Sequence, residues 1–167
     1  MKQTRVLALG IAAVALAATQ GLGAATVTSN VTVSATVAAT AKLALSSSTV
    51  TFANADPDTS PSIAATEGAI TITAKGKTST GGTIALTLLA ADDLKSGTDA
   101  IAIANVTWTA SGTGFAAGTM NKTTAQTVGS WTGSGNRAGT QSYALANSWS
   151  YATGNYAVTA TYTLTAP

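Results

Sequence analysis

Apolar and hydroxyl-bearing residues alternate along most of this chain, and this alternation restricts the fold more than any other feature. From residue 27 to 39, most odd positions are Val or Ala and most even positions are Thr or Ser. Successive side chains of a strand point to opposite faces, so a period of two indicates β-structure. The same period recurs in residues 43–45, 50–52, 70–74, 84–88, 106–110, 126–132, 143–145 and 156–164.

Turn-forming residues separate these stretches and divide the chain into short strands. About eight strands with hydroxyls on their outer face predict one all-β domain, an antiparallel β-sandwich of immunoglobulin-like type. A closed barrel is the alternative, and residues 63–67 and 90–95 are candidates for single helical turns. The turn signals include Asp56-Pro57-Asp58, Gly81-Gly82, Ser96-Gly97, Ser111-Gly112 and the Gly-rich residues 133–139.

Residues 1–25 have the features of a secretory signal peptide. Lys2 and Arg5 precede an uncharged apolar run of about 13 residues, which is shorter than the ~20 residues a membrane-spanning helix needs. Small residues follow this run, and we place the cleavage after Ala25, with Ala24 as the alternative. We therefore expect an exported protein, secreted or at the cell surface, whose mature domain comprises residues 26–167.

Basic and acidic side chains balance in residues 26–167. Scattered cations without interleaved aromatic residues give no basic patch for nucleic acid or anionic lipid. We expect neither as a partner, and no membrane insertion after processing. The charged residues are Lys42, Lys75, Lys77, Lys95, Lys122 and Arg137 on one side and Asp56, Asp58, Glu67, Asp92, Asp93 and Asp99 on the other.

The sequence contains neither His nor Cys, and this excludes most enzyme chemistry. There is no imidazole base, no thiolate nucleophile and no zinc, haem or iron–sulfur site of the usual ligand types. We predict a protein that is not an enzyme and that has no cofactor, no catalytic residue and no metal site. Asp56/Asp58 and Asp92/Asp93 offer oxygen ligands for weak Ca²⁺ binding, but their spacing differs from known calcium loops and is typical of solvated turns.

Three tryptophans lie beyond the midpoint of the chain, and two interpretations of them are open. Trp108 shares its phase with Val106 and Ala110, which favours a place in the core between two sheets. Alternatively, Trp108, Trp131 and Trp149 form a stacking platform for sugars, as in a carbohydrate-binding module.

Two groups of residues carry a resemblance to bacterial surface proteins. Residues 105–110, 127–131 and 154–167, which end on Gly154-Asn155-Tyr156 and an alternating strand, resemble WxL-type surface domains. Residues 31–37, 43–45 and 50–52 are similar to the start of spore-coat-U-like, pilin-related β-sandwich domains. The resemblance implies a cell-surface or fibre β-domain, and it transfers no binding residue to this chain.

Low charge and exposed hydroxyls favour contact between copies of the protein. Only 8% of the residues are charged, whereas about 25 to 35% keeps small domains apart in solution. We expect a structural or adhesive protein that self-associates or binds paralogous subunits of an extracellular fibre, fimbrium-like filament or coat. The alternative is a module that recognises a surface polysaccharide through Trp and Tyr.

The first alternating stretch is a candidate linking strand between subunits. Residues 26–39 would span about 45 Å if extended, far longer than a usual strand. Residues 26–40 either form the first strand of their own domain or complete the sheet of a neighbouring copy. In the second case Val27, Val31, Val33 and Val37 fill pockets of the neighbour.

Overall fold

The computed structural model describes residues 26–167, and the predicted signal peptide, residues 1–25, lies outside them. The chain divides into two units, residues 1–35 and 36–167. The second unit contains every strand of the described residues, and it has no α-helix. All strand pairs in it are antiparallel, which confirms the prediction of an all-β fold with antiparallel sheets.

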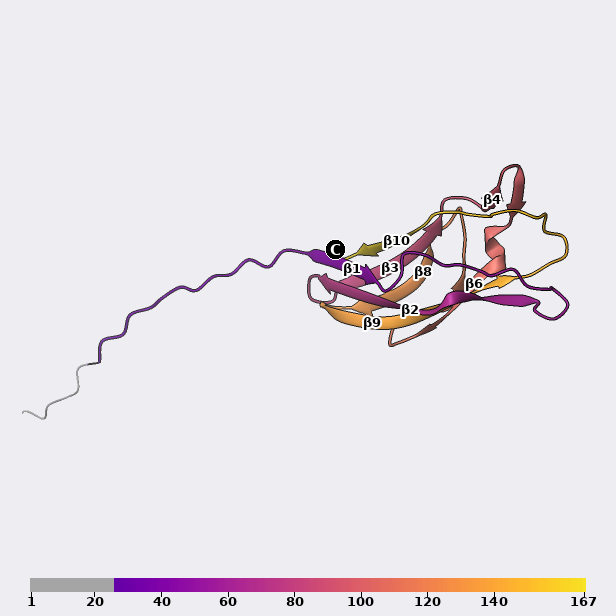
Figure 1. Cartoon of the computed structure of the whole chain (residues 1–167). Helices are drawn as coiled ribbons and strands as arrows, with labels where there is room; N and C mark the ends of the chain where they lie inside the picture. Colours follow the sequence, from indigo (N-terminus) through magenta and orange to yellow (C-terminus); the bar gives the residue numbers. More distant parts are fainter. Residues whose placement is uncertain (1–25) are drawn as a thin grey trace, which may run out of the picture. The chain divides into compact units, whose positions relative to one another are not determined.

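The second unit contains two main sheets and one short hairpin (Figure 1). The five-stranded sheet has the order β1-β2-β9-β6-β7, the three-stranded sheet has the order β10-β3-β8, and β4 pairs with β5. A single 3-10 turn, Ile103–Asn105, precedes β6. The strands are β1 (Thr40–Leu45), β2 (Ser62–Lys77), β3 (Thr83–Ala90), β4 (Leu94–Ser96), β5 (Asp99–Ile101), β6 (Val106–Ser111), β7 (Gly118–Thr119), β8 (Gln126–Thr132), β9 (Gly135–Ala146) and β10 (Ala160–Thr165).

Alternating side chains of both main sheets form one apolar core. Ile72 of β2, Leu86 of β3 and Val128 of β8 have no exposed surface. Ile84 and Leu88 flank Leu86 on the same face of β3 and are also buried. The period-two stretches of the sequence therefore place their apolar phase between the sheets, as expected for a sandwich.

The strands define two ends of the sandwich, which we call the hairpin end and the loop end. At the hairpin end β2 stops at Lys77, β3 begins at Thr83 and β1 begins opposite Lys77. The loop end carries residues 53–61, the β4–β5 hairpin and residues 147–155. Strand β10 runs from the loop end toward the hairpin end, so the arrowhead of β10 and the label C lie away from β4 in Figure 1.

Four expectations from the sequence are wrong in detail. Residues 26–167 contain ten strands, not about eight, and residues 63–67 belong to β2. A bulge explains this second error: the register of β2 on β9 shifts between Ala64 and Ala69, and Gly68 has a φ of 67°. A bulge moves the apolar residues from odd to even positions, which disguises one long strand as two segments.

The other two errors concern a predicted helical turn and a predicted Gly-rich turn. Residues 90–95 contain the end of β3 and the start of β4 instead of a helical turn. Residues 135–139 belong to β9, and Gly139 has a packing role there instead of a turn role. The ring of Phe115 lies where a Cβ on Gly139 would be, so this strand position accepts no side chain.

Candidate functional site

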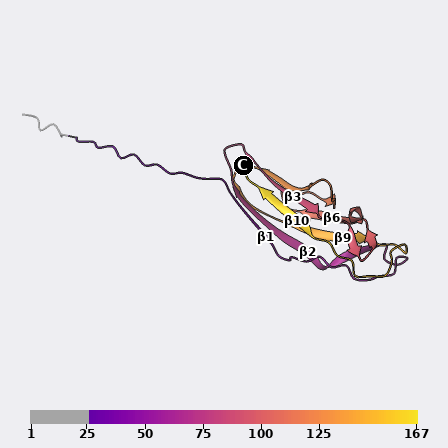
Figure 2. The same cartoon turned by 90° about the horizontal axis from the view of Figure 1, so that it is seen from above.

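Strands β1 and β10 are neighbours along one side of the sandwich (Figure 2). The apolar core is incompletely covered on this side. We call this side, lined by Leu43 and the inward residues of 156–166, the open edge. Every inward-facing residue of β10 is only half-buried, whereas those of β3 beside it are at most 2% exposed. The half-buried apolar residues of the C-terminal part are Tyr156, Val158, Ala160, Tyr162, Leu164 and Ala166.

The backbone of β10 is free along this edge. Among the described residues β10 pairs with β3 alone, and β1 pairs with β2 alone. Each strand therefore presents a row of unpaired N–H and C=O groups, which is a template for another strand. Charged residues usually protect such edges, but residues 156–166 contain none.

The predicted linking segment exposes all four of its valines. Val27, Val31, Val33 and Val37 are 92%, 84%, 89% and 74% exposed. No strand is assigned in residues 26–39, in contrast to the alternation of the sequence. A strand needs a hydrogen-bonded neighbour, and the structure holds a single copy of the chain. The role of the four valines as an inter-subunit strand stays a prediction.

Polar side chains form a small cluster in the core below the open edge. The amide oxygen Oε1 of Gln141 on β9 accepts hydrogen bonds from the hydroxyls of Tyr143, at 3.0 Å, and Tyr162. Gln141 is fully buried, and its Nε2 has no hydrogen-bond partner among the described residues. Burial raises the pKa of both tyrosine hydroxyls, and Tyr162 raises the pKa of Tyr143 further.

This cluster predicts a loss of stability at high pH. The folded state holds the protons of Tyr143 and Tyr162 to higher pH than the unfolded chain, in which tyrosines ionise at about pH 10. Their contribution to the free energy of unfolding is complete below pH 10 and falls as the pH rises above it, by up to about 1.4 kcal/mol per pH unit for each tyrosine. Urea unfolding from pH 9 to 11.5 measures the effect. The slope should decrease in Tyr143→Phe, and an unchanged slope would contradict the assignment.

The tryptophans divide between core and surface. Trp108 and Trp131 are 2% and 7% exposed, and the indole N–H of each donates to a backbone carbonyl, of Ala116 and Thr113 respectively. Trp149 is 70% exposed at the loop end, where its indole N–H donates to Asp58. The core interpretation of Trp108 is therefore confirmed. Of the three tryptophans, only Trp149 is exposed enough to stack on a sugar.

The aspartates proposed as weak calcium ligands are engaged with protein groups. The Nζ of Lys122 lies 3.3 Å from Asp92 and 2.5 Å from Asp93, and Lys95 lies 3.7 Å from Asp92. The hydrogen bond from Lys122 holds the pKa of Asp93 below its usual value. Asp56 accepts from the backbone N–H of Asp58, as in a turn. No group of three acidic residues suited to a metal ion occurs in the part of the chain that the structure describes.

Comparison with known proteins gave no match: no protein family, curated protein or solved structure resembles the chain closely enough to be assigned. Among the described residues, no helix is long and apolar enough to cross a membrane.

Sequence reasoning found the exposed segment but missed the open edge. The run Tyr156 to Leu164 alternates like the core strands β3 and β6, so its sequence does not distinguish an edge from an interior strand. The one available signal was the absence of charge from residues 156–166, which is unusual for an unprotected edge.

Proposed function

We propose that this protein is an exported, non-enzymatic subunit of an extracellular fibre or coat, and that it assembles by strand addition. Residues 26–39 of one copy lie along the open edge of the next. The observation that carries the proposal is the exposure of Val27, Val31, Val33 and Val37. All four are at odd positions of a segment that contains no charged residue. Alternate apolar side chains enter pockets in this mode of recognition, and main-chain hydrogen bonds supply affinity.

Donor and acceptor match in length and chemistry. The 14 residues of the segment are enough to cover the 11 residues of 156–166, and neither stretch contains a charged residue. Val31, Val33, Ala35 and Val37 occupy four consecutive positions of one face, and Ala160, Tyr162, Leu164 and Ala166 do the same in the acceptor. Each valine that becomes fully buried contributes about 1.5 to 3 kcal/mol.

The junction between the segment and β1 supports addition to another copy. A segment that returns onto its own domain needs a tight turn, and such turns use Gly, Asn, Asp or Pro. Residues 35–40 contain none of these.

Electron microscopy of the concentrated mature protein tests the proposal. We expect linear assemblies whose amount rises with protein concentration. A glycan pull-down is the parallel experiment for the carbohydrate-binding alternative. A protein that stays monomeric at high concentration and is retained on a polysaccharide through Trp149 would replace our proposal by that alternative.

Export makes a separate prediction about the mature N-terminus. If residues 1–25 form a cleaved signal peptide, mass spectrometry of the exported protein should find Thr26 or Ala25 as its first residue. Cleavage at this point leaves the donor segment intact at the new N-terminus. A mature protein that retains Met1 would contradict the proposed localisation.

A further inference from the structure

The charged side chains of the described residues are separated between the two ends of the sandwich. The loop-end half carries all six acidic residues and two basic ones, Lys95 and Lys122. Both of these lysines pair with Asp92 or Asp93. The side chains of this half therefore have a net charge of −4.

The hairpin end has the opposite charge. Its four charged side chains, Lys42, Lys75, Lys77 and Arg137, are all basic and give +4. None of them forms an ion pair with a described residue. Lys42 and Lys75 are direct cross-strand partners on β1 and β2, and like charges in such positions repel.

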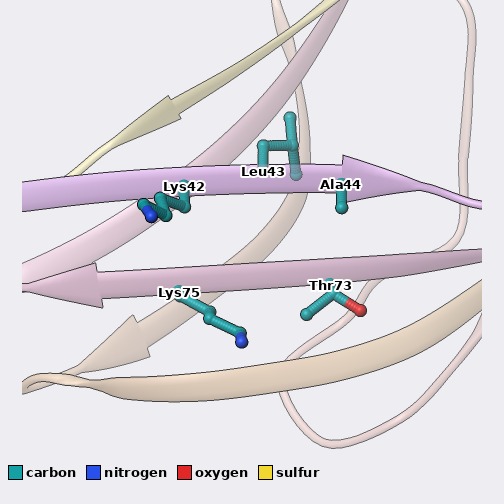
Figure 3. A pocket seen from close by; sticks show the side chains of 5 residues that line it. All are labelled: Lys42, Leu43, Ala44, Thr73 and Lys75. Atoms are coloured by element: carbon teal, nitrogen blue, oxygen red, sulfur yellow. The ribbon is translucent and has the colours of Figure 1, made fainter.

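The two lysines border a shallow hollow on the outer face of these strands. Figure 3 shows Lys42 and Lys75 beside Ala44 and Thr73, while Leu43 points to the other side of β1. The hollow has a volume of about 210 Å³. No carboxylate lines it, so an acidic group from outside the domain would relieve the repulsion between the lysines.

The direction of the donor segment decides which end of one copy meets which end of the next. The segment enters β1 at Thr40, which lies at the hairpin end of its own domain. If residues 26–39 run antiparallel to the acceptor's β10, residue 39 comes to the acceptor's loop end, because β10 runs from the loop end to the hairpin end. The donor's basic end then meets the acceptor's acidic end. Antiparallel pairing with the free side of β1 would instead place basic end against basic end.

We propose that the basic hairpin end of each subunit docks on the acidic loop end of the next, and that this contact sets the polarity of the assembly. The partner is a second copy of this chain. The inference rests on the proposed strand addition and extends it, since it selects β10 as the acceptor and a head-to-tail arrangement. A heterologous contact of this kind propagates into a filament when its rotation does not close a ring.

A charge-swap mixture tests the contact. In Lys42→Glu/Lys75→Glu/Lys77→Glu both ends are acidic, with net charges of −2 and −4. In Asp56→Lys/Asp58→Lys/Asp99→Lys both ends are basic, with net charges of +4 and +2. Each variant alone should assemble at least tenfold more slowly than the wild type at low ionic strength. An equimolar mixture should assemble again, because the ends of the two variants are complementary to one another. Light scattering and electron microscopy measure both results.

Controls separate this contact from general charge effects and from the strand addition itself. Thr71→Glu/Thr109→Glu adds two negative charges midway between the two ends, on the exposed faces of β2 and β6, and it should assemble like the wild type. Wild-type assembly should slow on the order of tenfold between 0.05 M and 1 M NaCl, because salt screens exposed charges. A mixture that assembles no faster than its components overturns the charge contact while strand addition stands. Wild-type protein that never assembles overturns both.

Discussion

Replacement of Trp108 with alanine should lower the free energy of unfolding by about 3 to 5 kcal/mol. Trp108 is 2% exposed and packs against Tyr143 with ring centroids 6.3 Å apart. Gly118 lies so close to the indole that a Cβ there would overlap the ring, so the neighbouring backbone is fitted to this side chain. Alanine would leave a cavity and would also remove the donor to the Ala116 carbonyl.

Trp149→Ala is the matched control for this experiment. It removes the same number of atoms from a side chain that is 70% exposed, so we expect a change within about 0.5 kcal/mol. Chemical denaturation of both variants gives the comparison. Equal effects at Trp108 and Trp149 would contradict the described core.

Deletion of residues 26–36 should abolish assembly and leave a folded domain. The core residues lie in β2, β3, β5, β6, β8 and β9 and in neighbouring loops, and the deleted valines are at least 84% exposed. Cooperative unfolding should therefore persist. The truncated domain keeps its open edge, so a peptide of residues 26–39 should bind it without restoring polymers. Loss of cooperative unfolding would instead assign the segment to the core of its own domain.

Point substitutions test the apolar side chains of the segment without changing its length. Val31→Asn/Val33→Asn removes two side chains that we place in the neighbour, worth about 3 kcal/mol or more, so assembly should weaken at least ~100-fold. Thr32→Asn/Ser34→Asn changes the opposite phase of the same segment and should have little effect. Concentration-dependent sedimentation measures both. Similar losses in the two variants would contradict strand addition.

The alternation of the sequence predicted most of the strands because the core is built from one phase of each. Residues 84–88, 106–110 and 126–132 were all identified, and the structure places them in β3, β6 and β8. The prediction failed where tertiary contacts override the local pattern. Gly68 shifts the phase within β2, and Gly139 makes room for Phe115 in a stretch that reads as a turn.

The candidate site depends on partners that a single sequence does not specify. Val31 and Val33 alternate like any core residues, and only their exposure in the structure distinguishes them. The acceptor residue Leu164 likewise differs from the core residue Leu86 in its burial and not in its residue type. The separation of charge between the two ends also cannot be predicted from the order of residues in the sequence, because Lys42 and Lys75 come together through strand pairing.

Cysteine cross-linking tests the central claim, which is that residues 26–39 of one copy pair with β10 of the next. The natural chain has no cysteine, so introduced thiols report only on the chosen positions. Directly opposed residues of antiparallel strands have Cα atoms about 4.5 to 5.5 Å apart, within the range of a disulfide. Thr163→Cys combined in turn with Thr32→Cys, Ser34→Cys or Thr36→Cys samples three registers on the outward face.

We expect one of these three double variants to give a ladder of disulfide-linked multimers on oxidation, which reduction converts to monomers. Thr163→Cys with Val33→Cys, whose side chains face opposite sides of the sheet, should give no ladder. An oxidised monomer linked within its own chain, or no disulfide in any register, would contradict assembly by strand addition.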